Sequence, residues 1–297
     1  MKYEIQGGSS LFTRDFFDSL LVETRYIDSK KPDTSYTVYG KKFSLPIMMA
    51  VSPLEDIHKN EITAIAGKAQ KTGVILWVDT DKKEEFSEIV STGVGTIRII
   101  KPYADNKIII SQIEQAQEGG TLAVGIDISR SFDDRRINGS RQKMAMSPKT
   151  MEEIREFVSA SSIPFIVKGI LSERDAYKCI MAGVQGIVVS GNYEARCCSV
   201  FPLMALPDIL NVVNGQIPVF VDCGIIDGMD AFKTLALGAS AVFAGQVITE
   251  FISSESIDSV FEKISSMSDE LKSIMAQTGC YNLSHMDKTV LRQIRMI

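Results

Sequence analysis

The sequence predicts an α/β protein in which eight parallel strands close into a barrel surrounded by helices. Eight short apolar segments rich in β-branched residues recur along the chain, and stretches with helical periodicity separate them. Several helical stretches end in a glycine just before the next apolar segment, at Gly73, Gly183 and Gly238, where a left-handed residue would end a helix. The length of 297 residues suits one (β/α)8 barrel, with an open doubly wound sheet as the alternative.

The first 45 residues precede the repeat. The amphipathic stretch LFTRDFFDSLLVE (11–23) predicts a helix, and TSYTVYGKKFSL (34–45) predicts a hairpin with its turn near Gly40. We expect residues 1–45 to cap the N-terminal end of the barrel.

The predicted strands are PIMMAVS, GVILWVD, GTIRIIK, TLAVGIDI, PFIVKGI, GIVVSG, PVFVDCG and AVFAGQ, which begin at residues 46, 73, 95, 121, 164, 186, 218 and 241. Between them lie helical patterns such as EITAIAGKAQKTG (61–73) and MDAFKTLALGAS (229–240). We assign the barrel core to 46–250, and the last helix and a helical tail to 251–297. No low-complexity linker divides the chain, so a single domain over 1–297 is predicted.

The composition excludes several classes of function. The formal net charge is −5 and no segment is dominated by Lys and Arg, which argues against nucleic acid as a partner. No apolar run reaches the length of a membrane span and the N-terminus lacks a signal-peptide pattern, so we expect a cytoplasmic protein without membrane contact. Five cysteines without C-x-x-C spacing indicate neither a disulfide framework nor a metal site.

In a barrel of this kind the active site lies at the C-terminal ends of the strands, so polar residues there are candidates by position. They are Ser52, Asp79, Lys101, Asp127, Lys168, Ser190, Asn192, Asp222 and Gln246. The alternative for any one of them is a structural ion pair at the rim of the barrel.

Two features stand out among these strand ends. Lys168 interrupts the apolar segment PFIVKGI, and a cation in that place suits an anionic ligand, a Schiff base or an electron-rich cofactor ring. The segments DCGIIDG (222–228) and FAGQ (243–246) follow the seventh and eighth strands, where loops commonly bind phosphate through backbone N–H groups. Gly224 and Gly245 are the phosphate candidates, with simple tight turns as the alternative.

With these residues in view, the chain resembles the FMN-dependent α-hydroxy acid oxidising enzymes, such as glycolate oxidase, lactate oxidase and flavin-linked lactate dehydrogenase. The likeness covers nearly the whole chain, from LFTRDFFDSLLVETRYID and FSLPIMMAVSPL through PFIVKGILSERDAYKCIMAGVQGIVVSGN to VFVDCGIIDGMDAFKTLALGASAVFAGQ. It implies bound FMN, a small anionic substrate such as a 2-hydroxy acid, and assembly as a homo-oligomer. The implied cofactor residues are Ala50, Val51 and Ser52 along the flavin ring, Lys168 and Ser190 at its N1 and O2 edge, and Asp222, Gly224, Gly245 and Gln246 toward the phosphate.

The departures from the family pattern fall where the chemistry takes place. The family continues its sixth strand with a catalytic histidine and a substrate-binding arginine, but this chain reads SGNYEAR. Asn192 therefore takes the place of the histidine, and Arg196 matches the arginine only after a one-residue insertion. Lys101 replaces a family tyrosine, and no arginine among Arg130, Arg135, Arg136 and Arg141 clearly matches the one in the fourth loop. The arginines beside the phosphate are replaced by Asp227 and Gln246, with Lys101 or Arg98 as substitutes.

These departures leave three hypotheses. Asparagine is not a general base, so the first is an FMN-dependent oxidoreductase with altered or lost proton abstraction, in which His58 or Tyr193 could replace the base. The second is an FMN-binding protein without hydroxy acid turnover, such as a sensor, carrier or regulatory partner. The third is a barrel that binds a different phosphorylated ligand.

Overall fold

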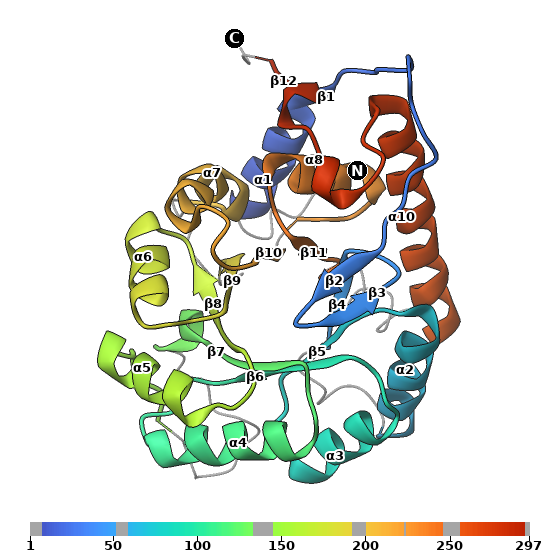
Figure 1. Cartoon of the computed structure of the whole chain (residues 1–297). Coiled ribbons are helices and arrows are strands. Elements are labelled where there is room, and N and C mark those ends of the chain that lie inside the picture. The colour runs from blue at the N-terminus through green and yellow to red at the C-terminus, as the bar shows by residue number, and fades with distance from the viewer. Residues whose placement is uncertain are drawn as a thin grey trace.

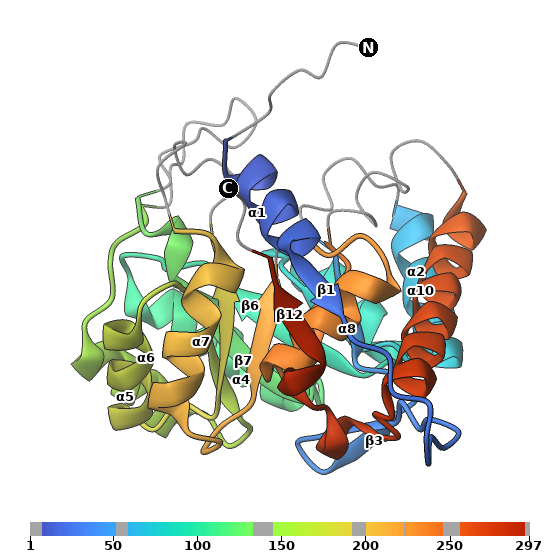
Figure 2. The same ribbon diagram turned by 90° about the horizontal axis from the view of Figure 1, so that it is seen from above.

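The computed structural model describes residues 8–51, 59–132, 145–191, 200–222, 224–245 and 256–294. Eight parallel strands close a barrel in which neighbours in the sequence are neighbours in space, which confirms the predicted fold class and excludes the open sheet (Figures 1 and 2). The strands are β4 (Ile47–Val51), β5 (Leu76–Val78), β6 (Thr96–Ile100), β7 (Ala123–Asp127), β8 (Phe165–Ile170), β9 (Gly186–Ser190), β10 (Val219–Asp222) and β11 (Ala241–Phe243).

Helices form an outer ring around these strands (Figure 1). They are α2 (Lys59–Thr72), α3 (Lys83–Ser91), α4 (Asn106–Glu118), α5 (Met151–Ala160), α6 (Glu173–Met181), α7 (Pro202–Val213), α8 (Gly228–Leu237) and α10 (Ile257–Thr278). Gly73, Gly183 and Gly238 have φ angles of 72°, 84° and 118°, so the predicted left-handed ends are confirmed. Within the described ranges, no helix combines the length and the apolar character needed to cross a membrane.

Alternation along each strand divides the core into two parts. One set of side chains, such as Met48, Trp77 and Phe220, packs inside the barrel. The residues between them, such as Met49 and Val78, pack against the helices. Both faces of every barrel strand are therefore buried, which explains why the strands read as continuous apolar runs.

The predicted hairpin plugs the N-terminal end of the barrel. Strands β2 (Tyr36–Val38) and β3 (Lys41–Phe43) flank a turn in which Tyr39 and Gly40 have φ angles of 48° and 76°. The Tyr39 hydroxyl donates to the Gln185 carbonyl at 3.0 Å, directly before β9 begins. Tyr36 and Val38 of the hairpin also belong to the cluster of side chains inside the barrel, so the hairpin covers this end.

The N-terminal helix differs from the expectation. Helix α1 (Gly8–Ser19) does not cap the N-terminal end, because it packs beside α7 and the loop after β10, at the end of the molecule opposite β3 (Figure 2). Arg14 makes two bonds of 2.8 and 2.6 Å to the buried carboxylate of Asp230 in α8. Since removing Arg14 would leave that carboxylate buried without its ion-pair partner, this contact fixes the position of α1.

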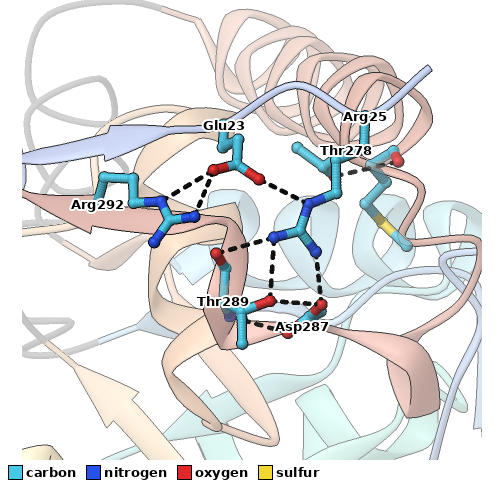
Figure 3. A network of polar contacts seen from close by, with 7 residues as sticks. Glu23, Arg25, Thr278, Asp287, Thr289 and Arg292 are labelled. Atoms are coloured by element: carbon cyan, nitrogen blue, oxygen red, sulfur yellow. Dashed lines mark hydrogen bonds and ion pairs between the residues drawn. The ribbon is translucent and has the colours of Figure 1, made fainter.

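The predicted helix also ends early. Residues Leu20–Val22 form strand β1, which pairs antiparallel with β12 (Leu291–Gln293). Around this pair, Glu23 accepts from Arg25 at 2.9 Å and from Arg292 at 2.6 Å, and Arg25 also donates to Asp287 at 2.8 Å (Figure 3). The network joins the two ends of the chain, which sequence periodicity could not reveal.

The plug can be tested at Gly186, the first residue of β9. A Cβ at this position would clash with the Tyr39 hydroxyl, so Gly186→Ala should lower the free energy of unfolding by about 1–3 kcal/mol. Adding Tyr39→Phe removes the clashing oxygen and should recover part of the loss. Urea unfolding of both single variants and the double variant measures this coupling. If the changes in the free energy of unfolding are purely additive, the Tyr39 side chain does not contact residue 186.

Candidate active site

The C-terminal ends of the strands carry a ring of charged and polar side chains, which we call the mouth of the barrel. Strand register places Asp127 of β7 beside Lys168 of β8, and Ser190 of β9 beside Asp222 of β10. All four residues had been selected from the sequence. The structure thus brings them together at adjacent strand ends.

Lys168 and Asp222 form the closest ion pair of this group. The Lys168 Nζ lies 2.6 Å from Asp222 Oδ2, so the pair reaches from β8 to β10 across β9. Burial alone would lower the pKa of Lys168, but the carboxylates of Asp222 and Asp127 outweigh it and raise the pKa above its ordinary value. The side chain is therefore an ammonium at neutral pH, and the stability it contributes is lost only as the pH rises through that raised pKa.

Ser190 lies between these two residues on β9. Its residue is 1% exposed, and its Oγ has no hydrogen-bond partner among the described residues. A buried hydroxyl without a hydrogen-bond partner costs free energy. The Ser190 Oγ is therefore available for a hydrogen bond to a bound molecule.

A second group of charges lies on the β5 and β7 side of the mouth. Arg130, in the 3-10 turn after β7, places its NH1 2.8 Å from Asp79 Oδ2 and its Nε 3.9 Å from Asp127 Oδ2. Asp127 also accepts from the backbone N–H of Ser129 at 3.1 Å and from its hydroxyl at 2.5 Å. These bonds hold both carboxylates toward the mouth.

Lys101 is tied to a carboxylate that sequence reasoning missed. Its Nζ lies 2.6 Å from Asp81 Oδ2 and 3.9 Å from Asp79 Oδ1, and Asp81 also accepts from the Tyr103 hydroxyl. Burial would raise the pKa of Asp81, but the hydrogen bond and charge of Lys101, together with hydrogen bonds from Tyr103 and Gln112, outweigh it and lower the pKa. Asp81 lies beyond the end of its strand, where the alternating pattern gives no signal.

The mouth contains a cavity of about 30 Å³. It is lined by Ala50, Trp77, Val78, Asp79, Ile99, Asp127, Arg130, Lys168 and Phe243. Trp77 and Phe243 pack edge to face with ring centres 4.7 Å apart and form an aromatic floor that sequence reasoning also missed. The signal was present, because the only tryptophan of the chain lies two residues before Asp79 on the same strand face.

The two glycines predicted to bind phosphate differ in their surroundings. A Cβ on Gly245 would lie 3.5 Å from Asp222 Oδ1 and 3.9 Å from the Ala50 Cβ, so this glycine adjoins the mouth. Gly224 has a φ of 67° and packs against Thr13 of α1. Only a residue tolerant of the left-handed region fits there.

Carboxylates occupy the backbone N–H groups at the start of α8. Ile226 donates to Asp230 at 3.2 Å, Gly228 donates to Glu270 at 2.7 Å, and Asp230 donates to Asp227 at 2.8 Å. The Ile226 and Gly228 donors belong to the segment DCGIIDG (222–228), in which Gly224 is the phosphate candidate. Internal carboxylates therefore already accept from two N–H groups of this segment.

The prediction that Arg98 substitutes for the arginines beside the phosphate is wrong. It points out of the barrel, where its guanidinium lies 4.1 Å from the centre of the Phe86 ring and donates to Gln115 at 3.1 Å. Burial lowers the pKa of Arg98 to about 10. Alternation already places it opposite to Ile97 and Ile99, which face inward.

Several predicted residues lie outside the described residues: Ser52, His58, Arg135, Arg136, Arg141, Asn192, Tyr193, Arg196 and Gln246. Val51 belongs to β4, but its side chain is not among those described. The described part of the mouth therefore consists of the residues that line the cavity, together with Lys101, Ser190, Asp222 and Gly245.

Comparisons with known proteins identify the family of the chain. The family model for FMN-dependent dehydrogenases matches residues 12–153 and 141–293. Glycolate oxidase 3 of Arabidopsis thaliana is 28% identical over 98% of this chain and 88% of its own length, and 2-hydroxyacid oxidase 1 of Homo sapiens is 25% identical over 88% and 82%. A mandelate oxidase structure with 3,3-difluoro-2-hydroxy-3-phenylpropionic acid superposes with a TM-score of 0.86 at 25% identity, covering 98% of this chain and 91% of that one. The chain therefore belongs to the FMN-dependent dehydrogenase family.

Proposed function

We propose that the protein is an FMN-dependent oxidoreductase related to the 2-hydroxy acid oxidising enzymes, with altered or lost proton abstraction. The observation that carries this proposal is the Lys168 ammonium together with the buried Ser190 hydroxyl on the adjacent strand. The ammonium is held by Asp222 at 2.6 Å, and the hydroxyl lacks a partner among the described residues. A cation and an unpartnered hydroxyl on neighbouring strands suit the N1 and O2 edge of a flavin ring.

The described residues fit this end of the cofactor. Ala50 lines the mouth cavity with Lys168, and Trp77 and Phe243 give that cavity an aromatic floor. We assign Ala50, Val51 and Ser52 to the flavin ring, with Lys168 and Ser190 at its polar edge. Bound there, the flavin would supply the hydride acceptor of the reaction.

The phosphate end departs more strongly from the family pattern. We keep Asp222, Gly224, Gly245 and Gln246 as the candidates for this end of FMN. The N–H groups at the start of α8 already bond to carboxylates, and Asp227 stands where the family has an arginine. We therefore expect the ring to contribute a larger share of the binding energy than the phosphate does.

The candidate catalytic residues and Asp222 have the following tasks in this proposal. Lys168 places positive charge at the ring edge, and Asp222 fixes the direction of the ammonium. Lys101 and Arg196 are the candidates for contact with the substrate, for which the resemblance predicts a small anionic 2-hydroxy acid. Asn192 occupies the place of the base and lacks a site that takes up a proton at neutral pH.

The second candidate function is an FMN-binding protein without hydroxy acid turnover. The sequence SGNYEAR at the end of the sixth barrel strand favours it, because the asparagine there cannot accept a proton. Homo-oligomeric assembly and a cytoplasmic location remain predictions under both functions.

The role of Lys168 is tested by Lys168→Met. Loss of the cation should lower the reduction potential of bound FMN and weaken its sulfite adduct by at least about tenfold, because a nearby charge stabilises the anionic ring. The matched control is Lys101→Met, which breaks a second ion pair at the mouth and should leave the potential unchanged. Spectroelectrochemistry and sulfite titration measure both variants. An unchanged potential in Lys168→Met would remove this lysine from the flavin site.

The loss of the base is tested by anaerobic stopped-flow reduction. Since general base assistance contributes roughly 10²–10⁴-fold to rate, glycolate and L-lactate should reduce the flavin very slowly or not at all, while dithionite reduces it normally. Asn192→His alone should recover little, because a base acts only within hydrogen-bond reach of its proton. Rapid bleaching by L-lactate would show that another residue, His58 or Tyr193 first, accepts the proton.

A further inference from the structure

Helix α1 is fastened to α8 at two points that lie one turn apart on α8 (Figure 1). The Arg14 guanidinium donates to both oxygens of Asp230, at 2.8 and 2.6 Å. The Lys233 ammonium donates to the Phe17 carbonyl at 2.8 Å. Asp230 and Lys233 are 1% and 8% exposed, so each contact satisfies a buried charged group. The two contacts therefore hold α1 in one place on α8.

The Asp230 carboxylate also reaches the backbone that follows β10. Its Oδ2 accepts from the Ile226 N–H at 3.2 Å in addition to the bond from Arg14. Without the guanidinium, Asp230 would be a buried anion that has lost its ion-pair partner, and such a group moves toward water or takes up a proton. Arg14 therefore stabilises the carboxylate position that fixes Ile226.

The same helix packs on Gly224, the candidate for the phosphate of FMN, which lies two residues before Ile226. Gly224 has a φ of 67°, and a Cβ on it would clash with Thr13 and lie 3.7 Å from Cε2 of Phe17. Thr13 and Phe17 lie one turn apart on α1, so they present one face of the helix to this glycine. The position of α1 thus constrains the backbone that would meet the phosphate.

The ion pair also sets the charge beside this backbone. Asp227 and Asp230 both lie at the start of α8, and Asp227 accepts from the Asp230 N–H at 2.8 Å. The hydrogen bond to Asp230 raises the pKa of Arg14, so the guanidinium stays charged and neutralises one of the two carboxylates. Without it, two negative charges would lie near a phosphate group, which is itself negative at neutral pH.

We propose that Arg14 is a positioning residue for FMN. Acting through Asp230, it holds the backbone of residues 224–228 and neutralises that carboxylate, so that this segment can bind the phosphate. Arg14 itself makes no contact with the cofactor. The inference rests on the proposed function for the identity of the ligand, and it adds α1, which lies outside the barrel, to the elements that build the site.

Titration of FMN and riboflavin into the flavin-free full-length chain tests the proposal, since the two ligands share the ring and differ by the phosphate. Quenching of the emission of Trp77, which lines the mouth cavity, follows the binding of both. Arg14→Gln should lower the preference for FMN over riboflavin by about three- to tenfold and leave the riboflavin affinity within about twofold. A general loosening of the fold would weaken both ligands alike.

Two further variants separate positioning from a loss of stability. Arg14→Gln combined with Asp230→Asn removes both charges and keeps an oxygen for the Ile226 N–H, so the preference should return to within about twofold of the wild type. The matched control is Arg25→Gln, because this guanidinium also pairs with two carboxylates (Figure 3) and its side chain is 35% exposed, against 33% for Arg14. It should leave the preference unchanged.

Amide hydrogen exchange of the flavin-free samples measures the order of the segment directly. Exchange in residues 224–228 should become faster in Arg14→Gln but not in Arg25→Gln, because only the first variant removes the partner of Asp230. Unchanged exchange in Arg14→Gln, or an equal loss of FMN and riboflavin affinity, would overturn the proposal. If the wild type bound neither flavin, the proposed function would fail, while the exchange rates would still decide whether Arg14 holds the segment.

Discussion

The mouth of the barrel depends on the ion pair between Lys168 and Asp222. A lysine on the inner face of a barrel strand is tolerated only with a partner, because desolvation of an unpaired ammonium is costly. Asp222 supplies that partner from two strands away, at 2.6 Å. The pair keeps Lys168 charged, and Ser190 lies on the strand between the two with a hydroxyl that has no hydrogen-bond partner among the described residues. Both features suggest a flavin edge.

The two ends of the barrel have opposite characters. At the N-terminal end, Tyr36 and Val38 of the hairpin belong to the interior cluster and close it with apolar surface. At the C-terminal end, the inner faces of several strands finish in charged residues, among them Asp127, Lys168 and Asp222. Parallel strands impose this asymmetry, since all their carboxyl ends meet on one side and one row of side chains changes from apolar to polar there. Function can therefore vary at the mouth while the rest of the barrel remains a packed core.

Much of the fold could be predicted from the sequence because local patterns encode it. Eight buried strands need eight β-branched apolar runs, and Lys168 was conspicuous because it interrupts one of them. Contacts between distant segments had no such signal. Leu20–Val22 looked helical, yet its strand partner Leu291–Gln293 lies at the other end of the chain. Likewise, nothing local to Gly228 shows that Glu270 of α10 occupies its N–H group. The prediction for Arg98 was wrong for a different reason. The alternation of side chains along β6 already places Arg98 outside the barrel, away from the phosphate.

The central claim is that the mouth holds a flavin, and the emission of Trp77 tests it most directly. Trp77 is the only tryptophan and it lines the mouth cavity, so its fluorescence reports on that place alone. Titrating FMN into flavin-free protein should quench this emission to a plateau at one FMN per chain. Emission that stays unchanged while FMN is added in large excess would contradict the account.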